Sequence, residues 1–251
     1  MAILREPVCM RLLAIGLCAL AFVAIACGGV DESPPLRVFA ASSLTDVLGE
    51  FAEEYEKTGH EVEFNFAGSS ALREQILDGA EADVFISANQ AVMQEIVDAG
   101  RAASDPVWVA ENTLTIAVPT GNPGNVTSLA DFADESLTLG FCAPEVPCGA
   151  LAQSVLADEK VISAADTLEP NVRSLLSKVE LGELDAALVY RTDVLASDEV
   201  DDVPLADGIG GRTIYLAVAL DTADPAAESF VSLMTGPPFD DMFVDAGFGV
   251  P

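Results

Sequence analysis

Basic residues and histidine are scarce in this sequence, and their scarcity excludes several classes of function. The chain of 251 residues has 11 lysines and arginines against 41 aspartates and glutamates, a formal net charge of −30. Without a large basic patch, neither nucleic acid nor an anionic membrane surface is an expected partner. The same charge sets a condition on anion binding. Because the long-range field repels anions, any attraction must be local, and salt screens that field beyond about a nanometre.

The only histidine, His60, lies in the loop Thr-Gly-His-Glu ahead of an expected strand. A serine nucleophile needs a base beside it, and the sequence has neither a Gly-x-Ser-x-Gly elbow nor a Walker loop. A single histidine also leaves a zinc site short of its usual ligands, and no spaced Asp/Gly loop suggests calcium. We therefore expect a protein that is not an enzyme and has no resident metal or cofactor.

Cysteines are few, and their positions divide them into two groups. Cys9, Cys18 and Cys27 fall in an N-terminal segment that carries Arg5 and Arg11 ahead of an apolar stretch over residues 12–26. About fifteen apolar residues are too few to span a bilayer and suit a secretory signal. The run Val-Ala-Ile-Ala-Cys resembles a lipobox. We predict a lipoprotein signal peptide over residues 1–26 and lipidation of Cys27; an ordinary cleavable signal is the alternative.

Residues 27–35 are small, polar and rich in proline, which is typical of a tether. No second apolar run long enough for a membrane follows it. These features predict an exported protein held by lipid at the outer face of a cytoplasmic membrane, at the cell surface or in the periplasm. In such a compartment the remaining pair, Cys142 and Cys148, favours a disulfide over the weaker alternative of a metal site.

Short apolar runs alternate with helical periodicities along the rest of the chain. Apolar residues at 44–55 and 172–179 recur with the spacing of one helix face. Such alternation predicts an α/β fold of mostly parallel sheets flanked by helices. The expected strands lie at 36–41, 62–67, 82–88, 113–119, 137–142, 185–190 and 213–220.

Four expected strand-to-helix junctions are built from small, hydroxyl-bearing or helix-starting residues. They lie at 39–46, 66–72, 147–151 and 170–175. Ligands of open α/β sheets bind beyond the carboxyl ends of the strands, and each helix start offers unpaired N–H groups and a partial positive charge. Several starts aimed at one point would hold a small dianion without lysine or arginine. For Ser43, helix capping with Asp46 is the alternative; for Tyr190 it is simple packing.

Six motifs in order carry a resemblance to a known family, the first being Val-Phe-Ala-Ala-Ser-Ser-Leu-Thr. They lie at residues 38–45, 66–72, 82–88, 146–149, 171–173 and 189–193. Together they resemble the periplasmic molybdate-binding proteins of ABC transporters, the ModA family of type 2 periplasmic binding proteins. The resemblance covers about residues 36–250.

This resemblance implies a two-lobed periplasmic-binding-protein-like fold with a hinge of two crossing strands. The expected lobe 1 comprises 36–117 and 218–251, and the expected lobe 2 comprises 118–217. Between the lobes the protein would bind molybdate, and tungstate as well, and deliver it as a monomer to the permease of an ABC importer. The alternative is a receptor for another tetrahedral oxyanion such as sulfate.

The ligand contacts that the resemblance implies involve five residues. They are the hydroxyls and amides of Ser43 and Ser69, the amides of Cys148 and Val172, and the phenol of Tyr190. The family often has alanine at the position of Cys148, a change that an amide contact tolerates. Nearby arginines are expected to be peripheral to the anion: Arg73, Arg173 and Arg191.

The lipid anchor can be tested directly. Replacing Cys27 by serine removes the thiol that would be acylated, so we expect the Cys27→Ser protein to move from the membrane to a soluble fraction or the medium. Fractionation followed by immunoblotting measures this. A variant that stays with the membrane would show that something other than Cys27 holds it.

Overall fold

The computed structural model describes residues 34–163, 165–221, 225–237 and 239–251. The predicted signal peptide, Cys27 and most of the predicted tether lie outside the described residues. Within the described ranges, no helix combines the length and the apolar character needed to cross a bilayer.

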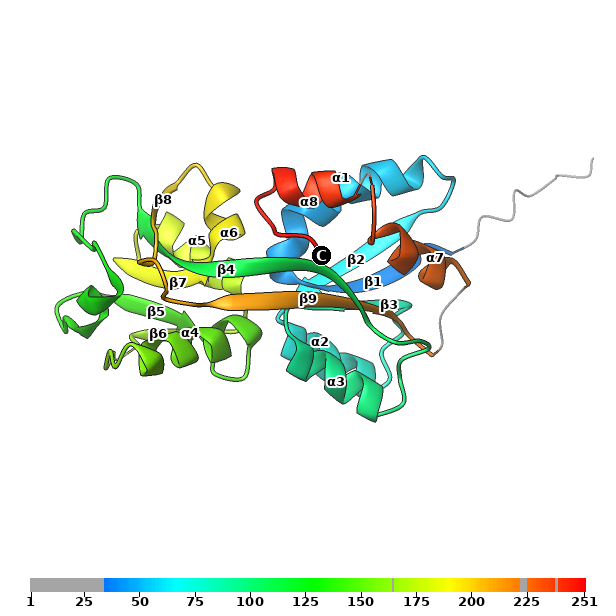
Figure 1. The fold of residues 1–251 in the computed structure, drawn as a ribbon, viewed down its shortest axis with the longest axis horizontal. Helices are drawn as coiled ribbons and strands as arrows, with labels where there is room; N and C mark the ends of the chain where they lie inside the picture. Colours follow the sequence, from blue (N-terminus) through cyan, green and yellow to red (C-terminus); the bar gives the residue numbers. More distant parts are fainter. Residues whose placement is uncertain (1–33, 164, 222–224, 238) are drawn as a thin grey trace, which may run out of the picture. The chain divides into compact units, whose positions relative to one another are not determined.

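Lobe 1 is built on three parallel strands with helices on both faces (Figure 1). The strand order is β2 (Val62–Ala67), β1 (Leu36–Ala41) and β3 (Val84–Ser87). One face carries α1 (Thr45–Glu56), α7 (Pro225–Leu233) and α8 (Phe239–Asp245). The other carries α2 (Ser69–Leu77) and α3 (Gln90–Asp98).

The apolar stripe predicted along α1 is the face that packs into the core of lobe 1. Phe51 is buried there and meets Phe230 and Phe239 edge-on, with ring centroids 5.0 and 4.0 Å away. Burying one such side chain contributes about 1.5–3 kcal/mol, and the edge-to-face geometry adds to it. This packing holds the C-terminal helices against the N-terminal sheet.

Lobe 2 repeats the same layering. Its strands are β6 (Thr167–Glu169), β5 (Leu139–Cys142), β7 (Ala186–Tyr190) and β8 (Val200–Val203). Its helices are α4 (Pro147–Asp158), α5 (Val172–Glu180), α6 (Arg191–Leu195) and the 3₁₀ turn η2 (Leu129–Ala133). Cys142 at the end of β5 forms a disulfide with Cys148 in the first turn of α4, with Cα atoms 5.9 Å apart.

Two long strands, β4 (Val107–Pro119) and β9 (Arg212–Ala219), run side by side between the lobes (Figure 1). Up to Thr113, β4 pairs with β9; from Leu114 it pairs with β7, and then with β8. The predicted fold and its two crossing strands are confirmed. The predicted lobe boundaries at 117/118 and 217/218 stay a prediction.

The sheet is mixed as a whole, although its pairs are parallel in the body of each lobe. Every antiparallel pair among the described strands involves β4 or β9. The reason is that β9 returns from lobe 2 into lobe 1, so it enters that sheet against the direction of β3. As a result the carboxyl ends of β1, β2, β5 and β7 lie beside the gap that the two crossing strands bridge.

Candidate functional site

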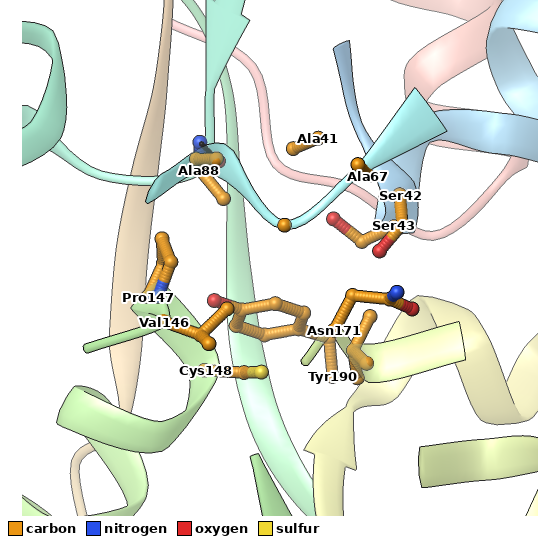
Figure 2. A pocket seen from close by; sticks show the side chains of 13 residues that line it. Ala41, Ser42, Ser43, Ala67, Ala88, Val146, Pro147, Cys148, Asn171 and Tyr190 are labelled. Atoms are coloured by element: carbon orange, nitrogen blue, oxygen red, sulfur yellow. Dashed lines mark hydrogen bonds between the residues drawn. The ribbon is translucent and has the colours of Figure 1, made fainter. Parts of the chain in front are cut away.

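A pocket lies where these strand ends meet, and both lobes contribute to its wall (Figure 2). Its cavity volume is only about 10 Å³, roughly the space that one water molecule needs and far below the roughly 300–1,000 Å³ of sites for drug-sized ligands. Its lining is Ala41, Ser42, Ser43, Ala67, Gly68, Ser69, Ala88, Val146, Pro147, Cys148, Asn171, Val172 and Tyr190. All five predicted contact residues are in this set.

Each predicted contact residue stands at the start of a helix or at the end of a strand. Ser43 lies in the 3₁₀ turn η1 (Ser42–Leu44), Ser69 opens α2 and Val172 opens α5. Cys148 is the second residue of α4, and Tyr190 is the last residue of β7. Three α-helices and η1 therefore begin at one pocket wall, which brings their unpaired N–H groups and positive dipole ends together.

The local sequence explains why these helices begin where they do. Asn171 accepts a hydrogen bond from the Ser174 N–H at 2.9 Å and so caps α5. Pro147 occupies the first turn of α4, where the missing N–H of proline is harmless. Gly149 follows because a Cβ there would lie 2.1 Å from the Ala143 carbonyl oxygen, so only glycine lets α4 start this close to the end of β5.

Three of the predicted contact residues carry a hydroxyl group, and the partners of these groups differ. Ser69 Oγ accepts from the Ala88 N–H at 3.0 Å, which leaves its own proton free. Ser43 Oγ lies 2.8 Å from the Tyr215 hydroxyl. The Tyr190 hydroxyl is buried with no protein partner, and burial raises the pKa of this phenol well above its ordinary value, so it stays neutral.

These contacts bear on the alternatives of helix capping by Ser43 and simple packing of Tyr190. Ser43 does not cap α1: the residue at the cap is Leu44, without a side-chain hydrogen bond, because η1 intervenes between β1 and the helix. Tyr190 packs, at 1% exposure, but its hydroxyl is unpaired and the ring lies across the pocket (Figure 2). A buried unpaired hydroxyl is unfavourable by about 1–3 kcal/mol unless something binds to it.

No charged side chain lines the pocket in the part of the chain that the structure describes. Arg73 pairs with Glu95 at 2.8 Å and with Glu74 at 3.0 Å. Arg191 is exposed at the start of α6. The described residues also contain no group of three or more His, Cys, Asp or Glu side chains that could hold a metal ion.

The lobes touch each other around the pocket. Ser70 Oγ, on α2, donates to the Glu145 carbonyl oxygen ahead of α4. Arg173 Nη1, on α5, lies 3.0 Å from Asp46 Oδ2 on α1. The lobes also approach closely at Gly68, because a Cβ there would lie 2.4 Å from the Pro170 carbonyl oxygen of the opposite lobe. The described arrangement is therefore a closed one.

A buried acidic residue, Asp193, lies in α6, three residues after Tyr190. The side chain of Asp193 is fully buried, and neither carboxylate oxygen makes a hydrogen bond of normal geometry. Its nearest cation is Arg173, whose Nη1 is 3.9 Å from Oδ1. Burial raises the pKa of Asp193 to about 8, and the Arg173 guanidinium only partly opposes that rise.

Comparison with known proteins assigns the chain to a family. The family model described as bacterial extracellular solute-binding protein matches residues 36–249. The molybdate-binding protein ModA of Mycobacterium tuberculosis is 34% identical over 89% of this chain and 88% of its own. The chain belongs to this family of solute-binding proteins.

Two further similarities agree with that assignment. A putative ABC transporter substrate-binding lipoprotein of Bacillus subtilis, YvgL, is 35% identical over 69% of each chain. The solved periplasmic molybdate-binding protein of Azotobacter vinelandii superposes with a TM-score of 0.71 over 86% of this chain and 99% of its own, at 22% identity. That structural match shows the fold alone.

Sequence reasoning missed some residues of this solute-binding protein that surround the pocket. Ala88 follows β3 and presents the N–H that orients Ser69. Tyr215 and Asn112 lie in the crossing strands and connect to Ser43 through hydrogen bonds. In the sequence each of these reads as an ordinary strand residue. Asp193 follows the Val-Tyr strand end and gave no signal of burial, since aspartate is usually exposed.

The raised pKa of Asp193 predicts a pH dependence of stability. An unfolded chain releases this proton near the ordinary pKa of 3.8, whereas the folded chain keeps it up to about pH 8. Between these values the folded state binds the extra proton, so the free energy of unfolding falls as pH rises. Between about pH 5 and pH 7, the free energy of unfolding of the wild type should fall relative to that of Asp193→Asn by about 1.4 kcal/mol per pH unit.

Urea unfolding of the two ligand-free proteins across this pH range measures that difference, and the comparison cancels the other titrating groups. A difference that stays constant with pH would mean that Asp193 ionises near its ordinary pKa.

Proposed function

We propose that this protein binds molybdate, and tungstate with it, between its two lobes and delivers the anion to the permease of an ABC importer. The observation that carries the proposal is a closed, uncharged pocket where Ser43, Ser69, Cys148, Val172 and Tyr190 converge from both lobes. The identity to a molybdate-binding protein over most of both chains supports the choice of solute.

The chemistry of the pocket favours a fully deprotonated dianion. Its hydroxyls have hydrogens to donate, and the helix starts supply N–H groups, while no carboxylate lines the wall to accept a proton. Phosphate near neutrality keeps a proton that needs an acceptor. Molybdate, tungstate and sulfate carry none. Sulfate has shorter bonds, so the size of the closed cavity would have to discriminate against it.

In this proposal the anion holds the two lobes together in the closed state. Ser43 and Ser69 belong to lobe 1, whereas Cys148, Val172 and Tyr190 belong to lobe 2. An anion bound by both sides stabilises the closed arrangement by its difference in affinity for the closed and open states. Motion about β4 and β9 would open the pocket, as in hinge closure of periplasmic binding proteins generally, and the permease would recognise the closed form.

The setting proposed for this function is an exported, lipid-anchored monomer. The lipobox-like run before Cys27 supports the anchor, and a relative described as a putative substrate-binding lipoprotein is consistent with it. Catalysis is not part of the proposal. His60 is exposed, stacks on Tyr55 and precedes β2, at the opposite end of that strand from the pocket.

Isothermal titration with molybdate, tungstate, sulfate and phosphate tests the choice of solute. We expect molybdate and tungstate to bind tightly and phosphate to bind weakly or not at all. Sulfate binding with molybdate inert would establish the alternative, a receptor for another tetrahedral oxyanion.

The hydroxyl of Tyr190 offers the sharpest test of the site. A hydrogen bond to a charged group contributes about 1.5–3 kcal/mol, so Tyr190→Phe should weaken molybdate binding roughly ten- to a hundredfold. Ser43→Ala and Ser69→Ala should weaken it by a similar factor for the same reason. Calorimetric titration of each variant gives the dissociation constants.

Two arginine variants serve as controls for that experiment. Arg73→Gln and Arg173→Gln remove ion pairs whose acidic partners are about half exposed. Surface ion pairs contribute about 0–1 kcal/mol, so each variant should weaken binding by less than about tenfold. A neutral Tyr190→Phe together with a severe arginine effect would mean that salt bridges hold the anion, and the proposed site would be wrong.

Closure itself can be blocked at Gly68. A methyl group there would meet the Pro170 carbonyl oxygen of the other lobe at 2.4 Å, so Gly68→Ala should keep the donors of lobe 2 from reaching the anion. Molybdate affinity should fall at least about tenfold. Small-angle X-ray scattering measures closure. In the presence of molybdate, Gly68→Ala should keep the radius of gyration of the ligand-free wild type, because its lobes cannot close.

Gly49→Ala is the matched control, because a Cβ at Gly49 meets nothing within 4 Å on the exposed side of α1. It should bind like the wild type. Normal affinity and compaction in Gly68→Ala would show that this contact does not limit closure.

A further inference from the structure

A chain of buried polar groups connects the pocket to both crossing strands. It starts at Ser43 Oγ, which lies 2.8 Å from the Tyr215 hydroxyl on β9. Asn112 Nδ2, on β4, lies 3.4 Å from the same hydroxyl and 2.7 Å from Thr192 Oγ1 at the start of α6. All four side chains are buried, with exposed fractions from 0% to 7%.

The direction of the hydrogens along this chain follows from Asn112. The Thr113 N–H lies 2.9 Å from one end of the Asn112 amide, and an N–H can only donate, so that end is the oxygen. The other end is the NH₂ group, which can only donate. It therefore donates to Thr192 and to the oxygen of Tyr215.

Tyr215 then acts as the hydrogen-bond donor to Ser43. Burial raises the pKa of its phenol far above the ordinary value, so it keeps its proton at physiological pH. Its oxygen faces the donor of Asn112, and among the described residues Ser43 Oγ is the one acceptor within hydrogen-bond distance for its hydrogen, which therefore points to Ser43. Ser43 accepts this bond, and its own hydrogen is left for the pocket. The Ala88 N–H does the same for Ser69.

We propose that Tyr215, backed by Asn112, is a positioning residue that fixes Ser43 as a hydrogen-bond donor toward the bound anion. Without it, the Ser43 hydroxyl could turn and present lone pairs, which repel an oxyanion. A donor that is already oriented loses less freedom on binding, and a chain of hydrogen bonds polarises its members in the same sense. This inference rests on the proposed function, because it assumes that an oxyanion occupies the pocket.

A double-mutant cycle separates positioning from general loosening of the structure. Tyr215→Phe keeps the ring that packs against Tyr190 and Phe248 and removes only the hydroxyl. In the wild-type background it should weaken molybdate binding about three- to tenfold. In the Ser43→Ala background it should change binding by less than about twofold, because Tyr215 acts through Ser43. Calorimetry on the full purified chain with sodium molybdate gives the four dissociation constants.

Two more variants complete the design. Asn112→Leu, similar in size and without the donor, should act in the same direction as Tyr215→Phe and by a smaller factor, since its bond to Tyr215 is the longest link at 3.4 Å. Tyr55→Phe is the matched control: Tyr55 is a buried tyrosine in the core of lobe 1, against Phe51 and Phe230. It should leave molybdate binding unchanged.

Equal losses from Tyr215→Phe in both backgrounds, or no loss in the wild type, would overturn the inference. If the wild type binds sulfate and not molybdate, the proposed solute is wrong. The same cycle is then measured with sulfate, and the loss of affinity from Tyr215→Phe in the wild-type and Ser43→Ala backgrounds decides the role of Tyr215. Binding of none of the four oxyanions would overturn both proposals.

Discussion

The first N–H groups of a helix have no partner within the helix, and the fold gathers several such groups at one pocket. Three α-helices and η1 begin at the wall of one small pocket. Their N–H groups would be costly to bury against apolar neighbours. The strand order, the capping of α5 by Asn171 and the proline that opens α4 all bring these starts to one place.

The acidic composition is compatible with this kind of site because the site contains no charge. A cationic pocket would draw in the carboxylates of a chain with net charge −30, and ion pairs would then have to break before an anion could bind. Arg73 and Arg173 illustrate the point, since both are paired with acidic side chains outside the pocket. Neutral donors face no such competition, and their strength comes from exclusion of water.

Periodicity and helix-start chemistry are local, so they predicted the alternation of elements and the four strand-to-helix junctions. The two crossing strands and the five contact residues came from the resemblance to a known family. The sequence did not predict β6 and β8, which are short strands with exposed residues and no clear apolar run. The capping interpretation of Ser43 was wrong because η1 occupies Ser42–Leu44 and α1 begins only at Thr45, with Leu44 at its cap. The pairing of Tyr215 with Ser43 could not be predicted from the sequence, because 172 residues separate them and only the fold brings them together.

The position of the polar chain in the crossing strands has a consequence for the open state. Asn112 and Tyr215 sit beside the point where β4 leaves β9, marked by the bond from the Leu114 N–H to the Gly211 carbonyl oxygen at 2.7 Å. When two bodies turn about a common axis, atoms near that axis are displaced least. Tyr215 directly precedes Leu216–Ala219, the part of β9 that pairs with β3, and β3 pairs in turn with β1, the strand that leads to Ser43. If the lobes turn about these strands as proposed, the Ser43–Tyr215 pair would keep its geometry in the open state, and the ordering on binding would fall on the lobe that carries Tyr190.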